Sequence, residues 1–498
     1  MAKCVMVLGT TSGAGKSWLA TALCRHYARQ GLKVAPFKAQ NMSNNARVVA
    51  SESGHGEIGS AQYFQALAAN ATPDVRMNPL LVKPERDTHS QVVLMGQLDE
   101  ALSKMPWRGR SALVWPVIVK ALDELVAQND VVVIEGAGSP AEINLHSSDV
   151  VNMRVALHCK AACLLVADID RGGAFAHLYG TWALLPDEER ALVRGYVLNK
   201  FRGDVALLAP APQMLQDLTG VPTVAVLPMW WHHGLPEEDG IFNDRTLTAG
   251  AVMRTIAVIA YPRISNLDEF QPLKNVPGIR LQWVRSPSDL AGLNAATDWI
   301  ILPGSMRTSG DLAWLRQQGL DAAVARHAGR GGAVLGICGG LQMLGEALID
   351  PHGIDGNAPG LGLLPLVTVF ATDKTVKHTR ASFDGHMSPS SSLSQASPWA
   401  QLAGITVQGY EIHHGQTAQH PAMAKAGNVA RDVMPGNLAW QSAGGNVLGV
   451  YLHGLFEDAN VLHALFGAAA PTLDSVFDGL ADYIEQHFEP GVLPGLIA

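Results

Sequence analysis

The chain has 498 residues, of which 48% are hydrophobic and only 16% charged, so it can form two or three domains with well-buried cores. Its net charge of −8 argues against a general nucleic-acid-binding role, and its apolar runs are too short or too interrupted to span a membrane. The first residues lead directly into an apolar strand, so we expect no signal peptide, and five cysteines without disulfide spacing predict a cytoplasmic protein. Nothing in the composition indicates an oligomeric state.

The first predicted elements are a buried strand, Cys4 to Leu8, a glycine-rich turn, and a helix from Trp18 to Gln30. The turn consists of Gly9, Thr10, Thr11, Ser12, Gly13, Ala14, Gly15, Lys16 and Ser17. A helix that starts after such a turn presents backbone N–H groups and a positive dipole end to a polyphosphate. Lys16 would reach the terminal phosphates and the Ser17 hydroxyl would bind Mg²⁺, so we predict a nucleotide site here.

The spacing of this turn departs from the usual Walker motif, because Thr10 stands where the first glycine belongs. Gly9-Thr10, four further residues and Gly15-Lys16-Ser17 instead resemble the loop of the dethiobiotin synthetase-like ATPases. Those enzymes use ATP to activate a carboxylate for attack by nitrogen, so the resemblance implies ATP as the cofactor. Thr11 occupies the place of the extra lysine of partition-type ATPases, which favours small-molecule chemistry over a dimer-switch motor.

A second strand, Lys33 to Lys38, is followed by a run of amide and hydroxyl side chains. Open α/β sheets bind ligands beyond the carboxyl ends of their strands, although the residues alone fit a polar turn equally well. The segment Pro36 to Asn45 is similar to a signature of the cobyric acid synthase family, the corrinoid amidases of cobalamin biosynthesis. That resemblance implies a corrinoid substrate. The candidates for contacting it are Lys38, Gln40, Asn41, Ser43 and Asn44.

Three later strands end in polar residues that could complete the nucleotide site. The apolar run before Glu135 predicts a buried parallel strand with this carboxylate at its end, a position that suits an Mg²⁺ ligand beside Ser17. The strand Ala162 to Ala167 ends in Asp168 and Asp170, which could share an ion or position a substrate. Asn199 resembles the position that reads the adenine edge in this group of ATPases, although a plain loop is a comparable interpretation.

The repeated strand–helix pattern predicts an α/β fold with two doubly wound domains, the first a P-loop ATPase-like parallel sheet. We expect this ATP-binding amidoligase domain at residues 1–234 and a polar linker at residues 235–250. A second sheet, of the class I glutamine amidotransferase type by resemblance, would occupy residues 251–470. A closing helix, Leu480 to Phe488, and a tail would lie in residues 471–498.

The second domain contains a different chemistry, built on Cys338 between a predicted strand and a predicted helix. Flanking glycines allow a sharp elbow that exposes the thiol at the helix N-terminus, where the dipole favours a thiolate. The elbow closely resembles the nucleophile elbow of class I glutamine amidotransferases. The resemblance implies glutamine as nitrogen donor, His453 as the base, and the backbone N–H groups of Gly339 and Gly304 as the oxyanion site. Leu455 stands where that class usually has a third, acidic member.

Two acidic residues, Glu411 and Glu457, are candidates for that third member. Nearly the whole chain resembles the cobyric acid synthase family, which implies amidation of the b, d, e and g carboxylates of adenosylcobyrinic acid a,c-diamide, with one ATP and one glutamine each. A cobyrinic acid a,c-diamide synthase is the alternative within enzymes, and the segment Pro36 to Asn45 argues against it. A regulatory ATP-binding protein with an inactive amidotransferase domain is the alternative from another class.

Overall fold

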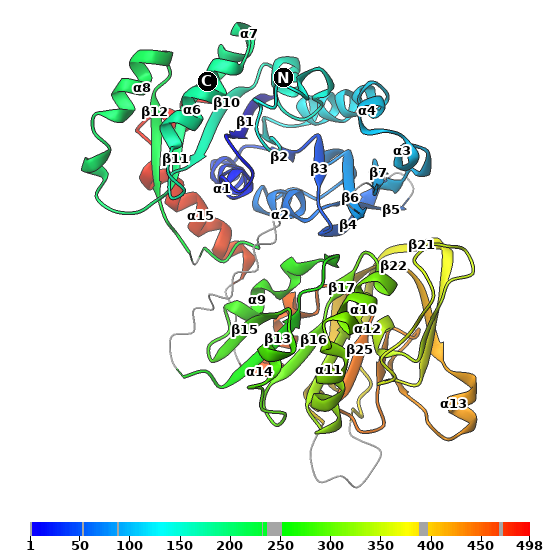
Figure 1. Ribbon diagram of the computed structural model, residues 1–498. Coiled ribbons are helices and arrows are strands. Elements are labelled where there is room, and N and C mark those ends of the chain that lie inside the picture. Colours follow the sequence, from blue (N-terminus) through cyan, green and yellow to red (C-terminus); the bar gives the residue numbers. More distant parts are fainter. Residues whose placement is uncertain are drawn as a thin grey trace. The chain divides into compact units, whose positions relative to one another are not determined.

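The computed structural model describes residues 2–51, 54–86, 89–231, 233–236, 251–387, 397–467 and 472–498. The chain forms two compact units, which are described separately (Figure 1). Unit 1 comprises Met1–Ser43, Val49–Leu235 and Thr472–Ala498, and unit 2 comprises Asn44–Val48 and Pro236–Pro471. Most of the predicted linker, residues 235–250, lies outside the described residues.

This division differs from the expected boundaries in two places. The five residues Asn44–Val48 belong to unit 2, although unit 1 continues on both sides of them in the chain. The C-terminal segment Thr472–Ala498 belongs to unit 1. Each unit is therefore assembled from segments that are far apart in the sequence.

Unit 1 is built on a six-stranded sheet in the order β12-β11-β10-β1-β9-β2, in which every neighbouring pair is parallel. Its strands are β1 (Lys3–Gly9), β2 (Val34–Phe37), β9 (Val131–Glu135), β10 (Ala162–Asp168), β11 (Val193–Phe201) and β12 (Thr223–Pro228). Alternate residues of β1 enter two different cores, Met6 and Leu8 on one face and Val5 and Val7 on the other. The strand is apolar throughout because helices cover both of its faces, which confirms the predicted doubly wound fold.

The helices of unit 1 follow the strands in the expected alternation. They are α1 (Lys16–Arg29), α2 (Ser60–Ala68), α3 (Glu100–Lys104), α4 (Trp107–Gln128), α5 (Met153–Cys159), α6 (Ala174–Leu184), α7 (Asp187–Arg190), α8 (Ala211–Thr219), α15 (Leu473–His487) and α16 (Val492–Gly495), with 3₁₀ turns at Val75–Met77, His146–Ser148 and Val205–Leu208. The closing helix α15 begins at Leu473, earlier than predicted, and Thr472 caps it by accepting a hydrogen bond from the backbone of Ser475.

Small strands add to unit 1 beyond the central sheet. They are β3 (Gln40–Met42), β6 (Leu80–Arg86), β7 (His89–Leu94) and β8 (Gln97–Leu98) in one sheet, and β4 (Ala46–Ser51) and β5 (Gly54–Gly59) in another, β4 starting in unit 2. The polar run after β2 is therefore not a simple loop, because Gln40–Met42 pairs in parallel with Leu80–Val82. This pairing fixes the positions of the segment that was expected to meet the substrate.

Unit 2 has a seven-stranded sheet in the order β15-β13-β16-β18-β25-β24-β23. Its strands are β13 (Arg254–Ile259), β15 (Ile279–Val284), β16 (Trp299–Leu302), β18 (Ala333–Ile337), β23 (Arg431–Met434), β24 (Ala439–Gln441) and β25 (Val447–Val450). The first five strands of this order run parallel, and β24 and β23 are antiparallel to their neighbours. The second predicted α/β sheet is thus present, with a mixed edge.

The remaining elements of unit 2 surround this sheet (Figure 1). They are the strands β14 (Ile264–Ser265), β17 (Gly304–Ser305), β19 (Ala347–Ile349), β20 (Ala358–Pro359), β21 (Leu366–Ser382) and β22 (Thr406–Gln419), the helices α9 (Gln271–Lys274), α10 (Thr308–Gln317), α11 (Leu320–Gly329), α12 (Gly339–Leu344), α13 (Pro421–Lys425) and α14 (Ala459–Phe466), and the 3₁₀ turns η4 (Leu267–Phe270), η5 (Pro287–Leu290), η6 (Ala400–Leu402) and η7 (Leu455–Glu457). The long strands β21 and β22 form an antiparallel pair.

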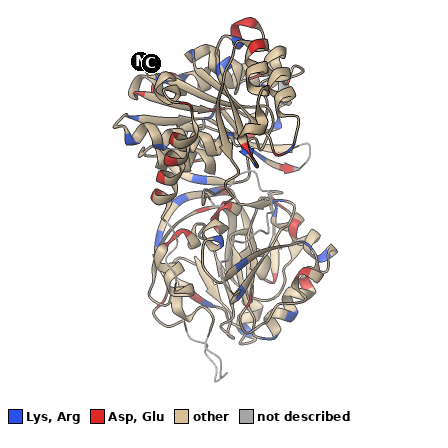
Figure 2. Ribbon diagram, turned by 90° about the vertical axis from the view of Figure 1, so that its left-hand side faces the viewer, with Lys and Arg blue, Asp and Glu red and all other residues tan. Residues whose placement is uncertain are grey.

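Charged side chains are spread over both units. In Figure 2 the Lys and Arg residues are interspersed with Asp and Glu along the described chain. No helix among the described residues has the length and apolar character needed to cross a bilayer.

Candidate active sites

The phosphate-loop residues of unit 1 connect β1 to α1, as the sequence predicted. Gly13 and Gly15 have φ angles of 72° and 102°, which L-residues rarely adopt, so the turn requires glycine at both positions. Lys16 is buried, and its Nζ donates to the carbonyl of Thr11 at 3.0 Å and to that of Gly138 at 3.2 Å. The ammonium group therefore already lies over the loop in which a terminal phosphate would bind.

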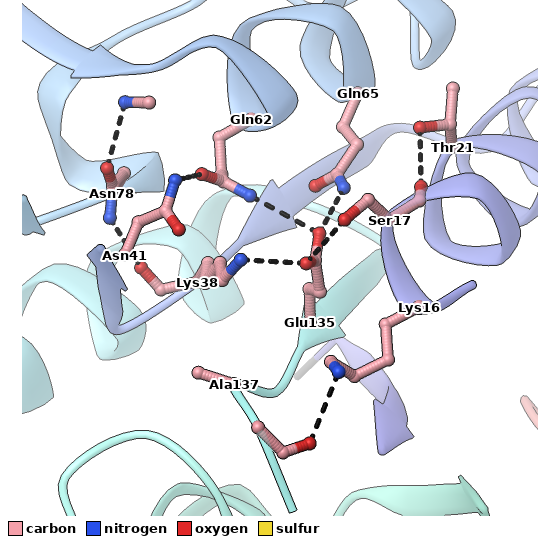
Figure 3. A network of polar contacts seen from close by, with 12 residues as sticks. Lys16, Ser17, Thr21, Lys38, Asn41, Gln62, Gln65, Asn78, Glu135 and Ala137 are labelled. Carbon is pink, nitrogen blue, oxygen red and sulfur yellow. Dashed lines mark hydrogen bonds and ion pairs between the residues drawn. The ribbon is translucent and has the colours of Figure 1, made fainter. Parts of the chain in front are cut away.

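The carboxylate of Glu135 is surrounded by four side chains at the end of β9 (Figure 3). Its Oε1 accepts hydrogen bonds from Ser17 Oγ and Lys38 Nζ, both at 2.8 Å. Its Oε2 accepts from Gln65 Nε2 at 2.6 Å and from Gln62 Nε2 at 3.4 Å. The second residue of α1, the residue after β2 and one face of α2 thus meet at one buried acid.

This acid is held in its ionised form. Burial alone would raise the pKa of Glu135, but the Lys38 ammonium and the hydrogen bonds from Gln65 and Ser17 outweigh it and lower the pKa below its usual value. A buried carboxylate next to a hydroxyl offers the hard oxygen ligands that Mg²⁺ prefers. Among the described residues, no group of three or more His, Cys, Asp or Glu side chains is arranged so that it could hold a metal ion.

The predicted substrate residues divide between different environments. Lys38 contacts Glu135 directly, and Asn41 joins the same network by donating to Gln62 Oε1 at 3.2 Å. Gln40 lies within β3, and Ser43 follows that strand with its backbone N–H on the carbonyl of Val82. Asn44 belongs to unit 2.

Gln62 and Gln65 are members of this network that the sequence did not identify. Both are buried on α2, three residues apart, so they lie on the same face of the helix. The sequence pattern that could have identified them is a pair of amide side chains at helical spacing on a mainly apolar helix. Such a pair is easily mistaken for part of a solvent-exposed face. Asn78 was missed as well. It supports the network by donating hydrogen bonds to the backbone carbonyls of Lys38 and Leu80.

Asp168 and Asp170 form ion pairs with different basic residues. Asp168 Oδ2 lies 3.0 Å from Lys200 Nζ, which also donates to the carbonyl of Gly13, whereas Asp170 forms an ion pair with Arg202. The two basic partners are Lys200, which lies within β11, and Arg202, which directly follows it. Asp168 is therefore linked to the phosphate loop through Lys200. The predicted roles of the two carboxylates, to share an ion or to position a substrate, stay predictions.

Asn199 also contacts the phosphate loop. Its Nδ2 donates to the carbonyl of Ala14 at 2.9 Å and its Oδ1 accepts from the backbone of Lys200. A Cβ on Gly15 would overlap this amide, which is a second reason for glycine at that position. Its contact with adenine stays a prediction.

In unit 2, Cys338 lies at the elbow between β18 and α12. Its φ and ψ of 51° and −106° are strained for a residue with a side chain, and such strain clusters at functional sites. A Cβ on Gly340 would overlap the carbonyl of Leu302, so the tight turn after the cysteine needs glycine. The thiol Sγ lies 3.6 Å from the carbonyl oxygen of Ile412.

His453 follows β25 and is almost completely buried, facing the Cys338 thiol. Its Nδ1 lies 3.2 Å from Glu269 Oε1, and Glu269 Oε2 accepts the backbone N–H of Gly454 at 3.1 Å. Burial would lower the pKa of His453, but the Glu269 carboxylate and the cysteine sulfur raise it to about 10. An imidazolium next to Cys338 stabilises a thiolate, which is the reactive form of a cysteine nucleophile.

The acid that contacts His453 is Glu269, whereas the two candidates from the sequence contact other residues. Glu411 binds His413 at 3.1 Å and Lys377 at 3.2 Å, and Glu457 accepts from Arg47 at 2.8 Å. Glu269 lies in the 3₁₀ turn η4, 184 residues before His453, and belongs to no motif. Sequence alone offered no signal for it.

The two glycines predicted to supply the oxyanion site lie close to these residues. A Cβ on Gly304 would come within 2.9 Å of His453 Cε1, and a Cβ on Gly339 within 2.9 Å of the backbone nitrogen of Ser305. Both positions therefore require glycine. The oxyanion role itself stays a prediction.

Comparisons with known proteins also divide the chain into a nucleotide-binding domain and a glutamine amidotransferase domain. A model described as the CobQ/CobB/MinD/ParA nucleotide binding domain matches residues 5–231, and one described as the CobB/CobQ-like glutamine amidotransferase domain matches residues 255–461. The chain is 76% identical to a cobyric acid synthase of Polaromonas naphthalenivorans, over 100% of both chains. It is 75% identical to one of Albidiferax ferrireducens and 74% identical to one of Variovorax paradoxus, covering 100% of this chain and 99% of each relative.

Proposed function

The chain belongs to the cobyric acid synthase family, and from this premise we propose which of its residues perform the two reactions of a glutamine-dependent amidating ligase. The observation that carries the proposal is the presence of two complete sites in one chain. Glu135 faces the Ser17 hydroxyl in unit 1, and Cys338 faces a His453–Glu269 pair in unit 2. The acceptor is a corrinoid, the b, d, e and g carboxylates of adenosylcobyrinic acid a,c-diamide.

The need for both sites follows from the chemistry of amide formation. A carboxylate does not accept ammonia directly, because an oxide or hydroxide is too poor a leaving group. Transfer of the γ-phosphoryl group of ATP to the carboxylate creates an acyl phosphate, and ammonia then displaces phosphate. Ammonia released from glutamine within the same chain reaches this intermediate before it is protonated in bulk water.

In unit 1, Lys16 and the backbone N–H groups of the phosphate loop bind the triphosphate of ATP. Ser17 and Glu135 would hold Mg²⁺, which neutralises phosphate charge when it is bound. Lys38 keeps Glu135 ionised. We assign to Lys38 the further role of contacting the carboxylate that is phosphorylated. Asn41 and the amides of α2 orient this cluster.

In unit 2, the Cys338 thiolate attacks the side-chain amide carbon of glutamine. His453 donates the proton with which ammonia leaves, and the Cys338 sulfur is left in a thioester. A water molecule then loses a proton to His453 and cleaves the thioester to glutamate. Glu269 holds the imidazole by its Nδ1, so that the other nitrogen faces the sulfur.

Mass spectrometry of the product formed from the a,c-diamide with ATP and glutamine tests this function. Four amidations of the a,c-diamide are expected, each of which replaces a carboxylate oxygen by nitrogen. No change in the a,c-diamide, together with two amidations of the unamidated corrinoid, would instead identify a cobyrinic acid a,c-diamide synthase. Absence of any glutaminase activity would indicate a regulatory protein. The five free cysteines support a cytoplasmic location for the reaction.

A further inference from the structure

Five residues from the N-terminal part of the sequence complete the surroundings of the glutaminase site. The segment Asn44–Val48 packs within unit 2, whereas the residues before and after it in the chain belong to unit 1. It directly follows the strand β3, which carries Asn41. None of the motifs for glutamine hydrolysis includes this segment.

The backbone of the segment is bound to the start of the 3₁₀ turn η4, the turn that carries Glu269. Asn45 Oδ1 accepts the backbone N–H of Leu267 at 3.0 Å. Asn266 Nδ2 donates to the carbonyl of Ala46 at 2.8 Å, and the same amide group donates to the hydroxyl of Tyr410 at 2.7 Å. These bonds hold the segment at the start of the turn that carries Glu269.

Arg47 then places its guanidinium between the two chain segments that form the His453–Glu269 pair. It is 2% exposed, forms an ion pair with Asp268, and donates from Nη1 to Glu457 Oε2 at 2.8 Å. Asp268 is the neighbour of Glu269, and Glu457 ends the turn η7 that begins one residue after Gly454. One buried cation therefore joins both sides of the pair.

A third contact leads from Arg47 to the imidazole. Its guanidinium carbon lies 5.2 Å from the centre of the Tyr410 ring, and that ring stacks on His453 with the centres 5.4 Å apart and the planes at 22°. The backbones of Tyr410 and His453 also exchange hydrogen bonds at 2.9 and 3.3 Å. Arg47 thus touches Asp268, Glu457 and Tyr410, each of which adjoins a residue of the glutaminase site.

We propose that Arg47 is a positioning residue of the glutaminase: it fixes the Glu269 carboxylate and the His453 imidazole in the geometry needed for proton transfer. The proposal rests on the proposed roles of Cys338, His453 and Glu269. A planar guanidinium can bind two carboxylates and an aromatic face at once, whereas an ammonium group is a single point charge. Small misplacement of a catalytic group reduces turnover more than it reduces substrate binding.

The test compares Arg47→Lys with Arg47→Met by steady-state glutamine hydrolysis. We expect Arg47→Lys to lower kcat about tenfold or more while KM for glutamine changes less than about twofold, since the substrate itself is not bound by this residue. Arg47→Met should have the larger effect, because two buried carboxylates then lose their cation. Amidation supplied with ammonium salt should continue in Arg47→Lys.

A matched control is Arg25→Lys, which alters an arginine of unit 1 that pairs with Asp478 at 2.7 Å. It should leave kcat for glutamine hydrolysis unchanged. Unchanged kcat in both Arg47 variants would overturn the proposal, and so would an equal loss of glutamine- and ammonia-dependent amidation in Arg47→Lys. Failure of the proposed function itself has a different signature, because glutamine hydrolysis would then survive in Cys338→Ala.

Discussion

His453 depends on two neighbours that come from different parts of unit 2. Cys338 faces one side of its imidazole, and the Glu269 carboxylate binds the Nδ1 nitrogen. All three side chains are buried, so their mutual electrostatic interactions are weakly screened by solvent. Substitutions at this site should therefore distinguish the effect of losing the nucleophile, Cys338, from the effect of losing Glu269, the carboxylate that raises the pKa of His453.

Replacement of Cys338 by Ala removes the nucleophile and leaves the ATP site intact. We expect glutamine-dependent amidation to fall by several orders of magnitude, as is usual for a missing nucleophile. Ammonia-dependent amidation should persist when ammonium salt is supplied at a pH where a useful fraction is unprotonated. Both rates are measured by product formation from the same corrinoid. Retained glutamine-dependent amidation would contradict the assignment of the nucleophile.

The pKa of His453 should fall when Glu269 is replaced by Gln. In the native site the carboxylate raises this pKa to about 10, so the imidazolium persists up to that pH and deprotonates above it. An amide has no charge to offset the effect of burial, so the imidazolium should lose its proton at lower pH. The alkaline limb of the pH profile for glutamine hydrolysis should move to lower pH, with a reduced kcat.

Glu411→Gln is the matched control for this pH profile. Its carboxylate binds His413 and Lys377, so its loss should leave the alkaline limb in place. If the alkaline limb moved in Glu411→Gln and stayed in place in Glu269→Gln, Glu411 and not Glu269 would be the acid that acts with His453.

At the residue scale, sequence identified groups that belong to local motifs. Cys338 and His453 could be predicted because glycine spacing and a strand end mark them. Glu269, Gln62 and Gln65 could not, because their importance comes from partners that are distant in the chain. Asp168 and Asp170 were placed at the correct strand end, but nearby cations determine where their carboxylates point.

Glu135 of β9 lies next to the continuous segment formed by strand β1, the phosphate loop and α1. Parallel pairing sets Val7 opposite Glu135, so the acid emerges next to the loop that precedes Ser17. The register of two strands, and not a local turn, thus brings the Glu135 carboxylate to the Ser17 hydroxyl. Such a site should respond to loss of the acid chiefly through its metal requirement.

We therefore expect Glu135→Gln to increase the Mg²⁺ concentration needed for half-maximal turnover, or to stop turnover. A neutral amide binds Mg²⁺ more weakly than a carboxylate does, and ATP would lose part of its charge neutralisation. The measurement is an Mg²⁺ titration of ammonia-dependent amidation, so that unit 2 plays no part. Glutamine hydrolysis measured without ATP provides the internal control. An unchanged titration would remove Glu135 from the metal site.

At the element scale, the strands that are buried on both faces could be predicted from sequence. Continuous apolar runs such as those of β1, β9, β10 and β18 fit only a strand covered on both faces by helices. The strand β3 was missed because Gln40-Asn41-Met42 has neither an apolar run nor alternation. It exists through its pairing with β6, a contact that local patterns do not encode.

At the scale of the whole chain, the C-terminal segment is part of unit 1. Helix α15 lies beside α1 in Figure 1, and ion pairs join Arg25 to Asp478 and Arg29 to Asp482. At the chain ends, Lys3 Nζ donates to the carbonyl of Ala498 at 2.7 Å. The segment Thr472–Ala498 thus packs against the helix that carries Lys16.

Deletion of residues 472–498 should unfold unit 1 or lower its melting temperature strongly. Helix α15 buries Val476, Phe477, Leu480 and Ile484, and exposing side chains of this kind costs about 1.5–3 kcal/mol each. That sum is comparable with the total stability of a domain, which is about 5–15 kcal/mol. Calorimetry and ammonia-dependent amidation measure the effect. Removal of only Ile497 and Ala498 is the control and should change the melting temperature far less.

A truncated chain with an unaltered melting transition would show that α15 is dispensable. The unit boundaries could not be predicted from sequence, because composition changes gradually at both ends of α15 and does not change at all at Asn44. Long-range packing determines to which unit a segment belongs. The five residues Asn44–Val48 are too few to produce a periodic sequence pattern.

The position of Arg47 in the chain also bears on how the protein is made and divided. Its partners Asp268 and Glu457 leave the ribosome 221 and 410 residues after it. During translation, Arg47 therefore cannot be buried between its two acidic partners until Glu457 has emerged. For the same reason, a gene split between the two halves would produce a glutaminase polypeptide without its buried cation, and a version that evolved as two separate subunits would have to supply that charge from a residue of its own.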